Sequence, residues 1–124
     1  MSGPARAVVA VVDDDPRILE SLEDLLESAG YEQRLHSSAS SLLTSGLSGI
    51  DCLITDISMP VMDGFELRDR VKQMRPELPV FLISAQRDLA HDRHVASVVA
   101  FFPKPFDGPT LLAAIGKALH AAKA

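Results

Sequence analysis

Side chains that can do chemistry occur at four widely separated places in this 124-residue chain, each at or just past the end of a short apolar run. Carboxylates in groups of two or three are ligands that Mg²⁺ prefers, and a carboxylate can also attack phosphorus to form an acyl phosphate. Phosphoryl transfer further needs alignment and neutralisation of charge, which a hydroxyl and an ammonium supply. The residues that together meet these needs are Asp13, Asp14, Asp56, Ser84 and Lys104.

Apolar runs and helical patterns alternate along the chain and predict how these residues are positioned. Continuous apolar runs are typical of strands buried on both faces. We expect strands at 7–12, 50–55, 79–83 and 98–102 and a shorter extended segment at 31–36. Amphipathic spacing predicts helices from Pro16, from Phe65 through Met74 and from Leu111 onward. We also expect a short serine-rich helix around 40–44 and a polar, poorly amphipathic helix at 89–96.

Five strands that alternate with helices imply a parallel sheet covered on both faces. Ligands of such sheets bind beyond the carboxyl ends of the strands. The pattern therefore predicts that the two N-terminal aspartates, Asp56, Ser84 and Lys104 converge on one edge of the sheet.

Composition narrows the class of protein. The length suits one domain, residues 1–124, and we expect no output domain within it. A net charge of −5 argues against binding a nucleic-acid backbone directly. The single cysteine, Cys52, excludes an intramolecular disulfide and fits a reducing compartment. With no signal-peptide pattern and no membrane-spanning run, we expect a cytoplasmic protein without membrane contact.

Each candidate residue also has an ordinary structural explanation. Asp14 or Asp15 can cap the helix that follows, because aspartate accepts backbone N–H bonds there. Asp56 alone suits a turn, Ser84 a strand end and Lys104 the protein surface. Three consecutive aspartates exceed what one cap requires, and crowded like charges repel unless a cation compensates. Their joint placement at one edge therefore favours a functional site.

The chain resembles the receiver domains of two-component response regulators across essentially its whole length. Asp56–Gly64 is the most specific segment, because an aspartate is followed by a proline four positions on and an Asp-Gly pair seven and eight positions on. The other matching segments are Val11–Pro16, Ile83–Ala85 and Lys104–Phe106. The resemblance implies a flavodoxin-like (βα)5 three-layer sandwich with a parallel sheet in the order 2-1-3-4-5.

Roles carried over by position follow from that resemblance. Asp56 corresponds to the phosphoacceptor, and Mg²⁺ is expected on Asp13, Asp14, Asp56 and the backbone carbonyl of Ser58. The resemblance also implies a cis peptide bond between Lys104 and Pro105, which would direct the lysine into the site.

The remaining roles concern the phosphate and its signal. Ser84 and Lys104 correspond to the phosphate-binding hydroxyl and ammonium, with Ser84 and Phe101 as the switch pair. Ser58 and Gln86 hold the positions that tune dephosphorylation. The chain departs from the family pattern at Ser97-Val98, where many members have Gly-Ala, and at Pro103 directly before the lysine.

The implied function is signalling rather than enzymatic turnover of a separate substrate. A sensor histidine kinase or histidine phosphotransfer protein would supply the phosphoryl group, and the domain would catalyse only its own phosphoryl transfer and slow autodephosphorylation. Phosphorylation would then alter the surface of the fourth helix, fifth strand and fifth helix, where an output partner, an output domain or a second copy in a homodimer can dock.

Two alternatives remain open from the sequence. Asp13-Asp14-Asp15 after an apolar run also resembles the nucleophile motif of haloacid-dehalogenase-like phosphatases, with Asp13 as nucleophile. That interpretation leaves the loop after Asp56 unexplained, and the chain has no room for a cap domain. The second alternative is a receiver-like module that binds a partner without being phosphorylated.

Overall fold

The computed structural model describes residues 6–85 and 100–123. The expected helix at 89–96 and the first two residues of the expected last strand lie outside these ranges. The described elements are β1 (Val8–Val12), α1 (Pro16–Ser28), β2 (Glu32–His36), α2 (Ala39–Ser45), β3 (Cys52–Asp56), α3 (Gly64–Met74), β4 (Val80–Ser84), β5 (Ala100–Pro103) and α5 (Gly108–Lys123).

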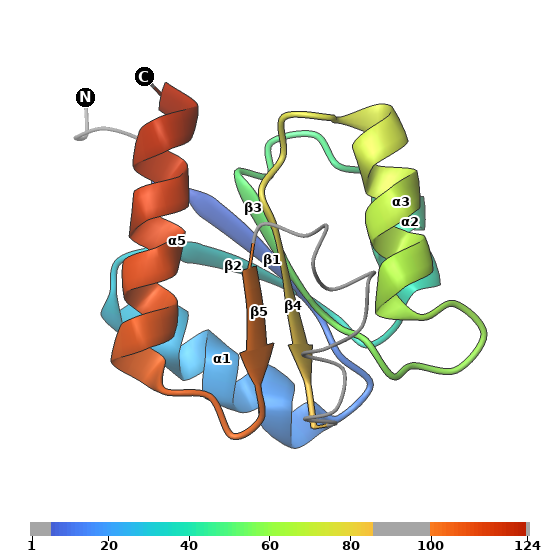
Figure 1. Cartoon of the computed structure of the whole chain (residues 1–124), viewed down its shortest axis with the longest axis horizontal. Helices are drawn as coiled ribbons and strands as arrows, with labels where there is room; N and C mark the ends of the chain where they lie inside the picture. Colours follow the sequence, from blue (N-terminus) through green and yellow to red (C-terminus); the bar gives the residue numbers. More distant parts are fainter. Residues whose placement is uncertain (1–5, 86–99, 124) are drawn as a thin grey trace.

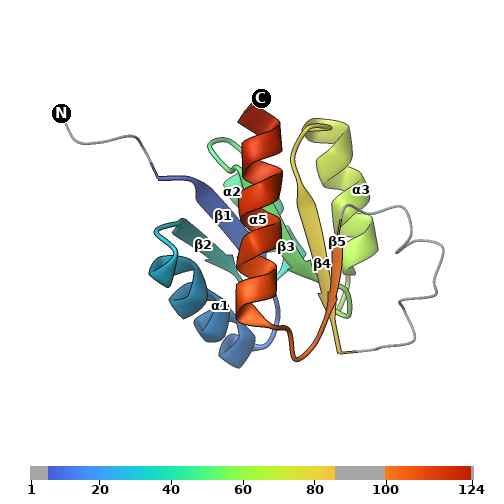
Figure 2. The same ribbon diagram turned by 60° about the vertical axis from the view of Figure 1, so that its left-hand side comes forward.

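The five strands form one parallel sheet in the order β2-β1-β3-β4-β5, as predicted. Helices α1 and α5 cover one face and α2 and α3 the other (Figures 1 and 2). The flavodoxin-like arrangement is therefore confirmed for the described elements. None of the helices in the described ranges is long and apolar enough to span a membrane.

Alternating residues of the buried strands supply the two layers of the core. In β1, Val9 and Val11 pack toward α1 and α5, whereas Ala10 and Val12 pack toward α2 and α3. Because β1, β3 and β4 are buried at every position, they carry continuous apolar runs. The edge strand β2 is partly exposed and correspondingly polar.

Most element boundaries lie one or two residues from the predicted ones, and α5 begins three residues earlier than expected. The last strand ends at Pro103, one residue later than expected, on the sheet edge where a missing N–H is tolerated. Met74, at the end of the predicted amphipathic helix, is 56% exposed. Met74 is the last residue of α3, directly before the C-cap Arg75.

Candidate functional site

The sheet brings the predicted residues together at its carboxyl edge. Asp13 directly follows β1, while Asp56 and Ser84 are the last residues of β3 and β4. Lys104 directly follows β5, and its backbone N–H donates to the Ser84 carbonyl at 2.7 Å. The peptide bond between Lys104 and Pro105 is cis, as expected.

Lys104 links two of the carboxylates. Its Nζ donates to Asp13 Oδ2 at 2.9 Å and lies 3.2 Å from Asp56 Oδ1. Asp13 is fully buried and Asp56 is only 4% exposed, so this ion pair lies largely out of water. An ammonium in this position neutralises part of the charge that two neighbouring carboxylates create.

Three carboxylates form what we call the acidic cluster: Asp13, Asp14 and Asp56. One oxygen from each lies within 4.8 Å of the others, and Asp14 is the exposed member. This set of oxygen ligands could hold a metal ion. Hard divalent cations prefer such ligands and complete their coordination with water or phosphate oxygens.

Crowding changes the ionisation of the central carboxyl group. Burial, followed by the charge of Asp13, raises the pKa of Asp56 to about 6, although Lys104 acts in the opposite direction. Burial of the Lys104 ammonium opposes its charge, but the hydrogen bond to Asp13 and the charge of Asp56 outweigh this effect and raise the pKa of Lys104. Asp56 is therefore mostly ionised at pH 7, at an electrostatic cost that an added cation would relieve.

Asp15 caps a helix, which was one of the explanations considered for the run of three aspartates. It is the N-cap of α1, and its carboxylate accepts from the Arg17 N–H at 2.9 Å. Its own N–H donates to Asp13 Oδ1 at 2.9 Å. The helix cap therefore also holds the Asp13 carboxylate, whose other oxygen bonds the lysine.

The loop between β3 and α3 borders the site and has an unusual backbone. Val61 adopts a φ of 71° and is fully exposed, while Met62 N–H donates to the Pro60 carbonyl at 2.8 Å. This hydrogen bond closes a γ-turn of the rare, strained type with positive φ. Beside the loop is a pocket of about 300 Å³ lined by Ser38, Ala39, Ser40, Pro60, Val61 and Met62, which includes none of the acidic cluster.

The structure describes three of the four other residues for which a role was predicted. Ser58 is exposed two residues after Asp56. Ser84 is fully buried, and Phe101 is partly buried against the core layer of α2 and α3. Gln86 lies outside the described residues. The roles of all four residues stay predictions.

Two features of the site were not predicted. Thr55 is fully buried beside Asp56, where its hydroxyl donates to the Asp56 carbonyl at 3.0 Å. A polar residue inside an otherwise apolar run was the available signal. Gly64 packs against the backbone of Asp56, and its place in the Asp-Gly pair was the only hint in the sequence.

Comparisons with known proteins agree with the fold. The model of the response regulator receiver domain matches residues 9–116. The chain therefore belongs to the response regulator receiver domain family and is a receiver domain of two-component systems.

Similar proteins include transcriptional regulators, and similar solved structures include receiver domains. The chain is 38% identical over 116 residues to the DNA-binding transcriptional regulator NtrC of Rhizobium meliloti, covering 91% of this chain and 24% of that protein. It is 37% identical to the response regulator protein TodT of Pseudomonas putida, covering 94% of this chain and 52% of that protein. The chain thus spans about a quarter to a half of these relatives. The signal receiver domain of an HD domain-containing protein from Pseudomonas fluorescens Pf-5 superposes with a TM-score of 0.88 at 27% identity, covering 96% and 98% of the two chains.

Proposed function

We propose that Asp56 accepts a phosphoryl group and that this domain transmits a signal through the resulting change of charge. The observation that carries the proposal is the nearly buried Asp56 carboxylate, with the Lys104 ammonium 3.2 Å away and two further carboxylates beside it. A pKa of about 6 leaves this group mostly ionised at neutral pH, in the form that attacks phosphorus.

The transfer requires little beyond positioning. An Asp56 carboxylate oxygen attacks the phosphorus of a phosphohistidine, an O–P bond forms, and the N–P bond breaks with its electron pair passing to the imidazole. Lys104 stabilises charge on the phosphoryl oxygens, and the Ser84 hydroxyl donates to one of them. Both groups act by electrostatic stabilisation, the main contribution to catalysis in phosphoryl transfer.

The acidic cluster fits Mg²⁺ through its oxygen donors, and Ser58 would add its backbone carbonyl. When bound, the ion would neutralise charge on the phosphoryl oxygens. Asp13 and Asp14 would hold it while Asp56 reacts. Asp15 and Lys104 each bond one oxygen of Asp13 and so fix that ligand in place.

Signalling would begin at the groups that can sense the new phosphate. We propose that Ser84 moves toward a phosphoryl oxygen and that Phe101, on the neighbouring strand, moves into the space it leaves. Such a change is a shift of population, so the phosphate must interact more strongly with the active arrangement. The surface around β5 and α5 would then bind an output partner, an output domain or a second copy. Ser58 and Gln86 would tune how water reaches the acyl phosphate.

In the cell, the phosphodonor would be a histidine kinase or histidine phosphotransfer protein in the cytoplasm. A phosphatase that uses Asp13 as nucleophile is less well supported. Asp13 is fully buried, and each of its oxygens accepts a hydrogen bond, one from the Asp15 N–H and one from Lys104. These bonds leave a lone pair on each oxygen for a cation, but they lower the nucleophilicity of the carboxylate toward phosphorus.

Phosphorylation of purified protein tests the proposal. With Mg²⁺ and acetyl phosphate, the protein should gain the mass of one phosphate that hydroxylamine removes. Asp56→Asn should abolish the gain, whereas Asp15→Asn, which alters a neighbouring carboxylate that caps α1, should retain it. If the parent remained unmodified under conditions that phosphorylate another receiver domain, the proposed phosphoacceptor role would be wrong. If Asp13→Asn alone abolished the gain, the phosphatase mechanism would replace it.

A further inference from the structure

Gly64, the first residue of α3, packs unusually closely against the end of β3. Its N–H donates to the Ile57 carbonyl at 2.9 Å. A Cβ added at this position would overlap the Asp56 carbonyl oxygen, and would lie 2.8 Å from the Ile57 Cα and 3.1 Å from the Asp56 carbonyl carbon. Only glycine leaves room for this contact. The reason is space rather than backbone conformation, because the φ of Gly64 is not in the left-handed region.

The atoms that an added methyl group would meet belong to backbone held on both sides. The Ile57 N–H donates to the Ile83 carbonyl at 3.0 Å, which fixes the end of β3 to β4. Leu67 and Val71 anchor α3 in the core and are both fully buried. A methyl group at position 64 therefore cannot be accommodated by a flexible side chain. Either the start of α3 or the backbone at Asp56 and Ile57 has to move.

This contact also closes the loop that borders the site. Gly64 and Ile57 join the two ends of the segment 58–63, which includes Ser58. Asp63 caps α3 by accepting from the Glu66 N–H at 2.9 Å. The position of α3 therefore sets where the loop leaves β3, directly after Asp56.

We propose that Gly64 is a positioning residue for the metal site, because its missing side chain lets α3 hold the backbone of Asp56 and Ser58 where the ligands converge. The proposal deepens the proposed function and rests on it for the identity of the metal. It does not require Gly64 to touch the ion or the phosphate. Supporting residues of this kind matter because they orient the ligands, and their loss typically weakens metal binding on the order of 10- to 100-fold.

Three variants separate positioning from general destabilisation. Gly64→Ala introduces the overlap at Asp56. Val71→Ala opens a cavity about two turns further along the same helix and should destabilise the protein. Leu67 and the hydrogen bond between Gly64 and Ile57 remain to hold the start of α3, so the loop should not move. Gly116→Ala adds the same methyl group to α5, where the nearest atom, Tyr31 Oη, would be at an ordinary 3.7 Å.

The experiment is a titration of each unphosphorylated protein with Mg²⁺, followed through backbone amide shifts, with urea unfolding measured in parallel. Gly64→Ala should weaken Mg²⁺ binding on the order of tenfold and shift the amides of Ile57 and Ser58 before metal is added. Val71→Ala and Gly116→Ala should bind Mg²⁺ as the parent does. Should Gly64→Ala fold poorly, it is combined with Gly116→Ala, which is expected to stabilise α5.

The outcomes distinguish failure of the positioning role of Gly64 from failure of the proposed function. Parental Mg²⁺ affinity in Gly64→Ala, or an equal loss in Val71→Ala, would overturn the positioning role. Failure of Gly64→Ala to fold even with Gly116→Ala would also overturn it, because the contact would then be a requirement of the fold. A parent that bound no Mg²⁺ would remove both proposals. A parent that bound Mg²⁺ but took no phosphate would remove only the phosphoacceptor role.

Discussion

Charged residues occur at both ends of the sheet but are used in opposite ways. At the amino end, Arg75 Nη1 donates to the carbonyls of Leu47 and Ile50 at 2.8 and 2.6 Å. Asp51 nearby accepts from the Val8 N–H at 2.8 Å. Each of these charges bonds backbone groups: the two carbonyls belong to the loop before β3, and the Val8 N–H begins β1.

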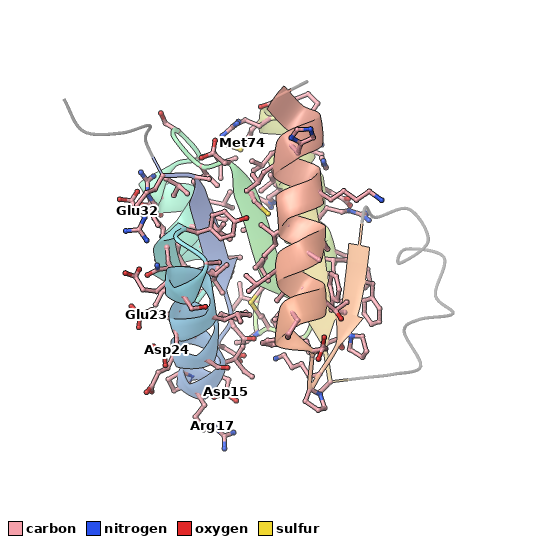
Figure 3. All side chains as sticks on the ribbon, turned by 90° about the vertical axis from the view of Figure 1, so that its left-hand side faces the viewer. Asp15, Arg17, Glu23, Asp24, Glu32 and Met74 are labelled. Atoms are coloured by element: carbon pink, nitrogen blue, oxygen red, sulfur yellow. The ribbon has the colours of Figure 1, made fainter. Side chains whose placement is uncertain are left out.

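The carboxyl end instead places like charges together. Three carboxylates form the acidic cluster, and two of them, Asp13 and Asp56, pair with the Lys104 ammonium. Burial, together with the charge of Asp13, raises the pKa of Asp56. Figure 3 shows the separation of the two ends, with Met74 at one and Asp15 and Arg17 at the other. The contribution of the amino end to the free energy of unfolding should therefore be the same with and without Mg²⁺ and at any ionisation of Asp56. The contribution of the carboxyl end should depend on both.

Lys104→Met should give the largest effect. Removing one partner of a buried ion pair leaves an uncompensated charge, so without Mg²⁺ at pH 7.5 the free energy of unfolding should fall by about 3 kcal/mol. The Lys104 side chain is 16% exposed and bonds Asp13, which is fully buried. Urea unfolding with and without Mg²⁺ measures the loss. Mg²⁺ should restore part of it by binding the folded state. A loss unchanged by Mg²⁺ would contradict the account of this end.

Asp56→Asn should stabilise the metal-free protein. The folded pKa of about 6 lies above the ordinary value of 3.8, so the folded state retains a proton that the unfolded state has lost between these values. This contribution to stability is present below about pH 4 and is lost as pH rises through about 6. At pH 7.5 the asparagine variant should be more stable than the parent by about 2 kcal/mol.

Unfolding midpoints from pH 4 to 8 check this sign. The difference between Asp56→Asn and the parent should grow with pH up to about 7 and then level off. Added Mg²⁺ should reduce the difference, because it stabilises the parent more than the variant. An asparagine variant that was less stable than the parent at pH 7.5 would show that the attraction of Lys104 outweighs burial and the neighbouring carboxylates at Asp56.

Arg75→Met probes the amino end. Loss of the guanidinium leaves the carbonyls of Leu47 and Ile50 without this donor, which should lower the free energy of unfolding by about 1.5 kcal/mol. The loss should be the same with and without Mg²⁺ and in the Asp56→Asn background, since distant sites are additive. If the loss from Arg75→Met changed when Mg²⁺ was added or when Asp56→Asn was present, the two ends would be coupled and the distinction between them would be wrong.

The carboxyl end was largely predictable from sequence, whereas the amino end was not. Asp13, Asp56 and Lys104 follow apolar runs, and the rule that parallel strands share a carboxyl edge is enough to bring them together. The strand order needed the family resemblance. Arg75 lies 25 and 28 positions from the carbonyls that it binds, and no sequence pattern marks a backbone acceptor.

Backbone geometry was the other feature that sequence could not give. The closeness of Gly64 to Asp56 depends on where α3 docks, which the apolar stripe of the helix fixes only roughly. The γ-turn at Val61 runs against expectation, because β-branched residues seldom adopt positive φ. Local preference is overridden there by the hydrogen bond between the neighbouring residues and by the anchored ends of the loop.

Val61→Gly should give the smallest effect, and it separates conformational strain from charge at the carboxyl end. Val61 has a φ of 71°, and its fully exposed side chain contributes no packing in the core. Glycine removes the steric cost of positive φ, about 1–2 kcal/mol, but adds flexibility to the unfolded chain, so the net gain should be about 1 kcal/mol. Gly30→Ala is the matched control: it places a Cβ at a φ of 85° with no atom within 4 Å, so it should cost stability through conformation alone. In urea unfolding, the gain from Val61→Gly should be the same with and without Mg²⁺, and so should the loss from Gly30→Ala, because neither substitution alters a charge. A Val61→Gly gain that disappeared when Mg²⁺ was added would mean that the strained turn is coupled to the acidic cluster, and strain and charge at this end would then be a single effect.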